Sequence, residues 1–244
     1  MKNIVAFDLE TTGLDKTKDQ IIQFGAVKFN PSTYEVVDTM DLRIQPVEPY
    51  SISISAYLKH RITKESLQGR PFLKDVAQRI VDFFDDCDIL TYNGKFDNDF
   101  LSYHLEKIGF KMDFLSRNLY DAFLEEKQRN GMHLEDVYKR YKGMTMVDAG
   151  LQAHDALSDV KATIAIFAAQ NRTKQVQPIK CYGVDNVVVD LEFNGRMVPC
   201  MNIGKYKSVP LDIIQKIDKE YLIWAVTKSN FTADSKHVIS TFII

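Results

Sequence analysis

The sequence is poor in cysteine and has no long uninterrupted hydrophobic segment. Its 244 residues include three cysteines, Cys87, Cys181 and Cys200, without a Cys-x-x-Cys pair. An odd number of unclustered cysteines is typical of a reducing compartment rather than of a disulfide-bonded secreted domain. No apolar run approaches the roughly 18 residues that a membrane-spanning helix needs, and no signal peptide precedes the first predicted strand. We therefore expect a cytoplasmic protein without a membrane partner.

The chain also lacks an excess of either charge. It carries 31 Lys and Arg against 33 Asp and Glu, so composition alone does not indicate a nucleic-acid-binding protein. With 45% hydrophobic residues, the chain can bury one substantial core and still provide a second small module. Repeats and low-complexity segments are missing as well. Function must therefore be sought in local motifs.

An acidic pair ends the first apolar segment of the chain. Residues 3–7 predict a buried strand that continues into Asp8, Leu9 and Glu10. Side chains two residues apart in a strand share a face, so Asp8 and Glu10 lie side by side while Leu9 points into the core. Two carboxylates that close cannot both stay ionised cheaply unless a cation lies between them. The alternative is a strand end whose acids face water.

A second acid, Asp97, follows a short apolar strand predicted at 88–92. Asn93-Gly94 is a turn signal, and apolar residues then recur at helical spacing over 97–108. Asp97 is therefore expected in the first turn of a helix that starts at the edge of a sheet. A carboxylate in that position also complements the helix dipole, so Asp97 alone does not establish a site.

A third motif combines His154 with Asp159. Residues 155–170 predict a long helix, and Asp159 lies next to its apolar stripe, an unusual position for a charge without a partner. His154 precedes this helix, after a loop predicted at 144–152 that brings it over the same place. A surface histidine is the alternative.

Together, these segments resemble the motifs of a known enzyme family. FDLETTG at 7–13, NGKFD at 93–97 and HDALSDVKAT at 154–163 are similar, in this order, to the three motifs of the DEDDh (DnaQ-like) 3′→5′ exonucleases. The resemblance covers about residues 1–172. Similar members are exodeoxyribonuclease X and the DNA polymerase III epsilon subunit.

The resemblance implies a metal site with a catalytic histidine. The implied ligands of two Mg²⁺ or Mn²⁺ ions are Asp8, Glu10, Asp97 and Asp159, and His154 is the implied general base. Two such ions can activate water and stabilise the charge that grows during phosphodiester cleavage. Oxygen ligands without cysteine favour these metals over zinc. We hypothesise that Asp8 bridges the ions, that Glu10 and Asp159 complete the water-activating site, and that Asp97 serves the second ion.

Residues beside the acidic motifs are expected to hold the 3′ end of a nucleic-acid strand. The backbone N–H and hydroxyl groups of residues 11–13 can contact the terminal nucleotide, and apolar side chains can pack against a base. His60 belongs to HRIT at 60–63, which is similar to the family's HGIT, although Arg61 replaces glycine and leaves the local turn open. Ordinary loop and core roles are the alternative. The predicted contacts here are Thr11, Thr12, Gly13, Leu14, His60, Asn93 and Phe96.

The order of predicted elements indicates an α/β fold. The resemblance implies a ribonuclease-H-like mixed five-stranded sheet flanked by helices. The pattern predicts strands at 3–9, 20–30, 35–45 and 88–92, helices at 72–85, 97–108, 133–142 and 155–170, and a further segment at 118–127.

A polar segment at 173–180 predicts a linker between an exonuclease domain at 1–172 and a small module at 181–244. In this module Asn194-Gly195 predicts a hairpin. GKYK at 204–207 and YLIW at 221–224 resemble a small α+β module that follows exonuclease domains similar to exodeoxyribonuclease X.

Basic and aromatic residues of this module are further candidates for nucleic-acid contacts. Lys205, Tyr206 and Lys207 form a cluster that can bind phosphate and a base. A core role is the alternative for Tyr206, and we expect Trp224 in the core.

Three functions fit these motifs. The first is a metal-dependent 3′→5′ exonuclease that removes nucleoside monophosphates from DNA 3′ ends in repair or proofreading, with a polymerase or repair protein as partner. The second uses the same chemistry on RNA or short oligoribonucleotides, which contacts to the 2′-OH would distinguish. The third is a catalytically silent scaffold that binds nucleic acid or a polymerase, against which the intact acids argue. Oligomeric state is left open.

Overall fold

The computed structural model describes residues 2–112, 114, 117–126, 133–173, 180, 182, 183, 185, 187–193 and 196–243. The chain divides into two compact units. The N-terminal unit comprises Met1–Met112 and Tyr120–Gln177, and the C-terminal unit comprises Asp113–Leu119 and Pro178–Ile244. None of the described helices combines the length and the apolar character that crossing a bilayer requires.

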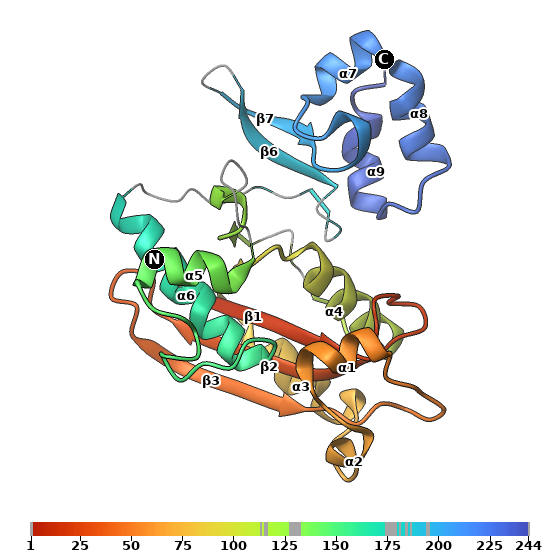
Figure 1. Cartoon of the computed structure of the whole chain (residues 1–244). Coiled ribbons are helices and arrows are strands. Elements are labelled where there is room, and N and C mark those ends of the chain that lie inside the picture. Colours follow the sequence, from red (N-terminus) through yellow and green to blue (C-terminus); the bar gives the residue numbers. More distant parts are fainter. Residues whose placement is uncertain are drawn as a thin grey trace. The chain divides into compact units, whose positions relative to one another are not determined.

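A five-stranded sheet forms the centre of the first unit. The strands lie in the order β3-β2-β1-β4-β5. Strand β1 is antiparallel to β2, and β2 is antiparallel to β3 (Figure 1). Strand β1 is also parallel to β4. The predicted mixed five-stranded sheet is thereby confirmed. The strands are β1 (Ile4–Thr11), β2 (Ile21–Phe29), β3 (Val36–Arg43), β4 (Asp88–Thr91) and β5 (Leu119–Asp121).

Helices α5 (Leu134–Lys142) and α6 (Ala156–Thr173) cover the face of the sheet that is turned toward the viewer in Figure 1. Ile4 and Ala6 of β1 pack in one buried cluster with residues of α6. Because side chains alternate along a strand, Asp8 and Glu10 continue the row of Ile4 and Ala6 and emerge on the same face.

Gly25 of β2 sets how closely α6 approaches the sheet. It pairs with Asp8 in the register of β1 and β2. A Cβ atom at this position would lie 2.5 Å from the backbone N of Leu157 and 2.6 Å from the carbonyl carbon of Ala156. The missing side chain therefore lets the first turn of α6 touch the strand directly beside Asp8.

Aromatic side chains fill the opposite face of the sheet. The ring of Phe7 lies 5.3 Å from that of Phe84, which follows α3 (Leu73–Phe83), and 6.2 Å from that of Phe24. Ile62 and Leu67 pack on Ile22 of the same face. This second face of the sheet is thus buried as well, and Leu9 points into its core as predicted.

The predicted elements of the N-terminal unit are present with small shifts at their ends. Helix α4 (Lys95–Lys107) starts two residues before the predicted 97, and α6 extends to Thr173, inside the predicted linker. The segment at 118–127 forms β5 and a short helical turn η1 (Leu124–Glu126), and residue 127 lies outside the described part. The loop predicted at 144–152 has neither helix nor strand.

Two short helices were not predicted, α1 (Ile54–His60) and α2 (Lys64–Leu67). With seven and four residues they are too short to show an apolar period, although Ser53 and Thr63 cap them. Between them Arg61 adopts a left-handed conformation with φ of 58°, and its N–H donates to the Tyr57 carbonyl. The turn that glycine would favour is therefore formed by arginine here.

The C-terminal unit is a small α+β module. Strands β6 (Val188–Phe193) and β7 (Arg196–Met201) pair in antiparallel fashion, as the predicted hairpin requires. Asn194 and Gly195 lie outside the described residues, as do residues 174–179 of the predicted linker. The remaining elements are the helical turn η2 (Gly204–Tyr206) and helices α7 (Leu211–Ile217), α8 (Lys219–Thr227) and α9 (Ala233–Ser240).

Candidate active site

Four carboxylates from three separate elements meet in the N-terminal unit. Asp8 and Glu10 belong to the end of β1, Asp97 to the first turn of α4, and Asp159 to the first turn of α6. Together with His154 they line one cleft of about 360 Å³. The structure thus brings together all five residues that the sequence motifs singled out.

Backbone contacts fix Asp97 beside β1. Its Oδ1 atom accepts a hydrogen bond of 3.1 Å from the Leu9 N–H. The turn before α4 is held by Asp121 of β5, whose carboxylate accepts bonds from the N–H groups of Asn93 (2.8 Å) and Gly94 (3.3 Å). Asp121 was not among the predicted site residues, because nothing in the local sequence links it to a turn 27 residues earlier.

A polar network fixes the start of α6 against the sheet. The Gln23 side chain donates to Asp155 Oδ2 (3.0 Å) and accepts from the Ala156 N–H (3.3 Å). Arg43 also donates to Asp155 Oδ2 (3.3 Å), while Asp155 Oδ1 accepts from the Ser158 N–H. Asp155 is therefore a helix-capping residue, which its position before an apolar helix could have shown. Gln23 and Arg43 carry no comparable signal.

His154 lies at the entrance of the same helix in a left-handed conformation, with φ of 59°. Its backbone N–H donates to Asp159 Oδ2 at 3.2 Å. One carboxylate oxygen of Glu10, one ring nitrogen of His154 and one carboxylate oxygen of Asp159, each able to bind a metal ion, lie within 4.8 Å of one another. This spacing lets one small ion or water molecule contact all three side chains.

The crowded carboxylates hold protons more tightly than usual. Burial, followed by the neighbouring charges of Asp97, Asp159 and Glu10, raises the pKa of Asp8 well above its ordinary value. Burial and the charges of Asp159 and Asp97 raise the pKa of Glu10 to about 8. Burial is also the main cause that raises the pKa of Asp97 and that of Asp159 to about 7. At neutral pH the cluster therefore favours either protons or a cation.

The donor set fits divalent metal ions that prefer oxygen. Within the described part of the chain, neither Asp8 nor Glu10 accepts a hydrogen bond from protein, and Asp159 Oδ1 is buried without a partner. Unpartnered buried carboxylate oxygens are costly unless a ligand binds them. Mg²⁺ and Mn²⁺ take such ligands, and no cysteine lines the cleft among the described residues.

Most of the residues predicted to contact the 3′ end of a nucleic-acid strand also line this cleft. Leu14 is 78% exposed at its rim, and the ring of Phe96 lies 4.5 Å from that of Phe100, which buries one side of it. The predicted residues in the lining are Thr11, Gly13, Leu14, His60, Asn93 and Phe96.

Thr12 is placed differently and does not line the cleft. It is 1% exposed, and its hydroxyl donates to Asp19 Oδ1 (3.0 Å) while accepting from the Gln20 N–H (3.0 Å). The Thr11 hydroxyl likewise donates to the Gly13 carbonyl (2.6 Å). These hydroxyls hold the loop after β1 and so shape the wall of the cleft.

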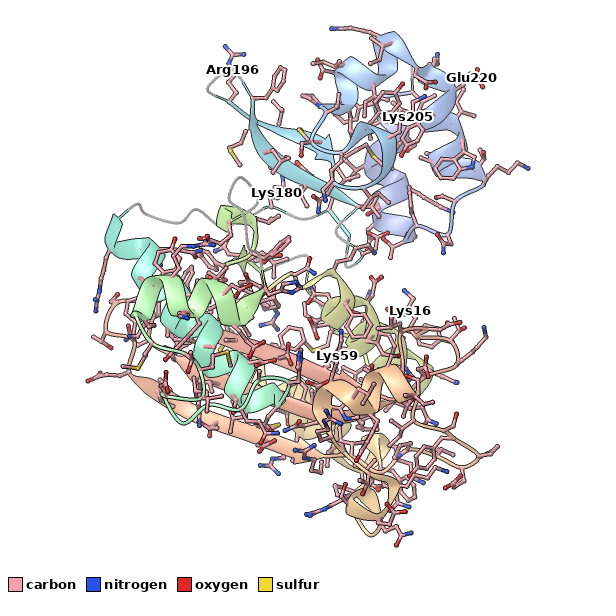
Figure 2. The ribbon with its side chains drawn as sticks, viewed as in Figure 1. Lys16, Lys59, Lys180, Arg196, Lys205 and Glu220 are labelled. Carbon is pink, nitrogen blue, oxygen red and sulfur yellow. The ribbon has the colours of Figure 1, made fainter. Side chains whose placement is uncertain are left out.

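The basic-aromatic cluster of the C-terminal unit is bound within that unit. The Lys205 ammonium and the Tyr206 hydroxyl both donate to Asp218 Oδ2 at 2.8 Å, while Lys207 is exposed (Lys205 is labelled in Figure 2). The expectation that Trp224 lies in the core is wrong, because its side chain is 46% exposed. Leu222 and Ala225 fill the buried positions of α8 instead.

Comparison with known proteins places this site in a family. The chain is 28% identical over 204 residues to a DNA polymerase III PolC-type of Caldanaerobacter subterraneus subsp. tengcongensis, covering 82% of this chain and 14% of that protein. It is 31% identical over 197 residues to the PolC-type polymerase of Staphylococcus epidermidis, covering 79% and 12%. The chain thus spans about a seventh or less of the length of these relatives.

Solved structures share the fold. Exonuclease I of E. coli, in complex with a dT13 oligonucleotide, superposes with a TM-score of 0.61 at 21% identity, covering 72% of this chain and 42% of that one. The family model described as exonuclease (RNase T) matches residues 5–167, which contain all three acidic motifs but not the C-terminal unit. The chain therefore belongs to the RNase T family of DEDDh-type exonucleases.

Proposed function

We propose that this protein is a metal-dependent 3′→5′ exonuclease that removes nucleoside 5′-monophosphates from the 3′ ends of DNA. The observation that carries the proposal is the convergence of four carboxylates, two buried and two half-buried, and one histidine in a single cleft. DNA is the favoured substrate because the relatives are DNA polymerases and the structural neighbour, exonuclease I of E. coli, was solved in complex with a dT13 oligonucleotide. A polymerase or repair protein is accordingly the proposed partner.

Asp8, Glu10, Asp97 and Asp159 would hold two Mg²⁺ or Mn²⁺ ions. When bound, such ions supply an activated water and stabilise the charge that grows on the phosphate and the leaving oxygen. The protein's own contribution is to fix the oxygens in place. Asp97 is held by the Leu9 N–H and Asp159 by the His154 N–H, so the carboxylates need little rearrangement before they bind.

His154 is the proposed general base. Burial, together with the nearby charge of Lys59, lowers the pKa of its imidazole, so that the ring is neutral at physiological pH. A neutral ring nitrogen can accept the proton of the attacking water, and the imidazolium then lies beside Glu10 and Asp159, which stabilise it.

Leu14 and Phe96 would position the terminal nucleotide. Both line the cleft that contains the acids, and the exposed Leu14 side chain offers an apolar surface to a base. Stacking and packing of this kind tolerate any base, as an exonuclease that proceeds along a strand requires.

The proposal is tested with 5′-labelled DNA and RNA oligonucleotides of one sequence, incubated with Mg²⁺ or with EDTA. His154→Ala is compared with His237→Ala, which removes an exposed histidine of α9. With Mg²⁺, we expect the unaltered protein and His237→Ala to shorten DNA stepwise from its 3′ end, and His154→Ala to do so only slowly. With EDTA, we expect no shortening.

Preferential shortening of RNA would replace DNA by RNA as the substrate. Shortening from the 5′ end, or equal rates for the two histidine variants, would contradict the proposed polarity or the role of His154. A protein that binds these oligonucleotides without cutting them would be a scaffold instead.

A further inference from the structure

The cleft contains four carboxylates but, among the described residues that line it, a single lysine or arginine, Lys59. This residue belongs to the last turn of α1, whose other lining residues, Ser55, Ala56 and His60, carry no fixed positive charge. Figure 2 labels Lys59 on this helix. A polyanionic strand that enters the cleft thus meets one permanent side-chain cation.

The Lys59 ammonium is not engaged by the protein. It is exposed, and no salt bridge or hydrogen bond joins it to any part of the chain that the structure describes. Nearby lysines differ in this respect. Lys64 of α2 pairs with Glu48 at 3.8 Å and lies 4.1 Å above the ring of Tyr50, and Lys95 pairs with Asp99 at 3.1 Å. Lys59 therefore remains available for a ligand.

The charge balance of the cleft gives this lysine a role. The proposed two divalent ions would neutralise the four carboxylates, so the positive charge of Lys59 would then be in excess. Lysine side chains bind backbone phosphates as point charges, and such contacts supply most of the salt-sensitive affinity for nucleic acids. Lys59 lines the same cleft as His154 and the four acids, so its charge lies close to the proposed reacting centre.

We propose that Lys59 binds a backbone phosphate of the nucleic-acid strand whose 3′ end occupies the cleft and thereby holds that strand in the cleft. This inference rests on the proposed exonuclease function and adds a substrate-binding residue to it. The competing role is structural, because a lysine at the C-terminal end of a helix also complements the helix dipole.

The salt dependence of binding separates the two roles. Binding of a fluorescent 3′-ended DNA oligonucleotide is measured by anisotropy over a range of salt concentrations with Mg²⁺, in the His154→Ala protein to slow cleavage. Lys59→Gln and Lys59→Arg are compared with Lys74→Gln, a lysine that lines a different hollow. For one lost phosphate contact on a single strand, the slope of log Kd against log salt falls by about 0.7.

We expect Lys59→Gln, but not Lys74→Gln, to show the shallower slope and a several-fold higher Kd at low salt. Lys59→Arg should restore both the slope and the Kd. A lowered melting temperature with an unchanged slope would establish the structural role and overturn the proposal.

Kinetics with His154 intact distinguish this inference from the proposed function. Lys59→Gln should raise KM several-fold with little change in kcat, as expected when uniform binding is lost. If the unaltered protein fails to shorten DNA or RNA, the proposed function fails. If it shortens the strand and Lys59→Gln behaves like Lys74→Gln, only the role of Lys59 is refuted.

Discussion

Asp218 of the C-terminal unit accepts hydrogen bonds from Lys205, Tyr206 and the Tyr221 N–H, whereas Asp8 of the cleft accepts none from the described residues. The two carboxyl groups respond in opposite directions. Hydrogen bonds from Lys205 and Tyr206 lower the pKa of Asp218, while burial and like charges raise that of Asp8. An acid that stabilises the fold has protein partners, and an acid without them is available to a ligand.

Glu126 extends this comparison into the N-terminal unit. Its side chain is completely buried, as Asp97 and Asp159 nearly are. Yet its carboxylate accepts from Arg140 (2.5 Å), the Tyr141 hydroxyl (2.8 Å) and Gln170 (3.1 Å). Burial alone therefore does not mark the active site. The marker is burial combined with missing partners and like-charged neighbours.

Asp8→Asn is expected to have the largest effect on activity. Loss of this proposed metal ligand should lower kcat by more than about 10³-fold, because bound metal supplies several kcal/mol of transition-state stabilisation. Measured without metal at pH 8, the same variant should melt at a higher temperature than the unaltered protein, since one repelling carboxylate is gone. Full activity in Asp8→Asn would show that this unpartnered carboxylate does not hold a metal ion needed for cleavage.

His154→Ala should lower kcat by about 10²- to 10⁴-fold, the usual contribution of a general base. The carboxylates remain, so Mg²⁺ should still raise the melting temperature of this variant. Activity is measured by strand shortening and metal binding by thermal shift. A variant that loses both properties would show His154 to be a metal ligand rather than a base.

Glu126→Gln should lower the stability of the fold but leave the activity unchanged, the reverse of what is expected for Asp8→Asn and His154→Ala. Arg140 loses one charged partner but its side chain is 32% exposed, so we expect a loss of about 2 kcal/mol rather than that of a fully buried pair. Urea unfolding measures this loss. Activity per folded molecule should stay near that of the parent, and a collapse of kcat would show that Glu126 also serves catalysis.

The pH dependence of stability should depend on metal. Because Glu10, Asp97 and Asp159 have raised pKa values of about 7 to 8, the folded state binds more protons than the unfolded state between about pH 4 and 8. Without metal, the melting temperature should therefore fall as pH rises through this range. The lowered pKa values of His60, His104 and His154 act in the opposite direction, but mainly below about pH 7, so the fall should be clearest above that pH.

Excess Mg²⁺ should raise the melting temperature most at the upper end of this pH range, where the carboxylates are ionised. A metal-free profile that is flat, or a rise with Mg²⁺ that does not depend on pH, would contradict the raised pKa values.

Asp218→Asn should have the smallest effect. The amide oxygen can still cap α8, and exposed ion pairs such as that with Lys205 contribute little to stability. We expect a change in melting temperature near the detection limit and unchanged exonuclease activity. Loss of activity here would show that this carboxylate has a functional role despite its protein partners.

The acids of the site could be predicted from the sequence because the position of each follows from a local pattern. The two-residue period of a strand places Asp8 beside Glu10, and helix starts place Asp97 and Asp159. The mixed sheet followed in the same way from long periodic segments and from the family resemblance. What brings these elements together is not local. Gln23 contacts Asp155 across 132 residues of chain, and only the folded structure shows this pair.

The errors have similar physical reasons. Helices α1 and α2 are too short for their apolar residues to form a stripe, and Ile54 of α1 is 79% exposed. Trp224 was expected in the core because it is large and aromatic, but it lies two residues from the buried Leu222, toward the other side of α8. Which side of a short helix is covered depends on packing partners that are distant in sequence.

Calorimetric titration of Mn²⁺ into the metal-free protein measures directly whether the acids of the cleft bind metal, with Asp8→Asn and Asp218→Asn as the paired variants. We predict saturable binding of about two ions with release of protons near pH 7, lost or halved in Asp8→Asn and unchanged in Asp218→Asn. Absence of saturable binding, or equal binding by both variants, would show that the unpartnered acids of the cleft do not hold metal.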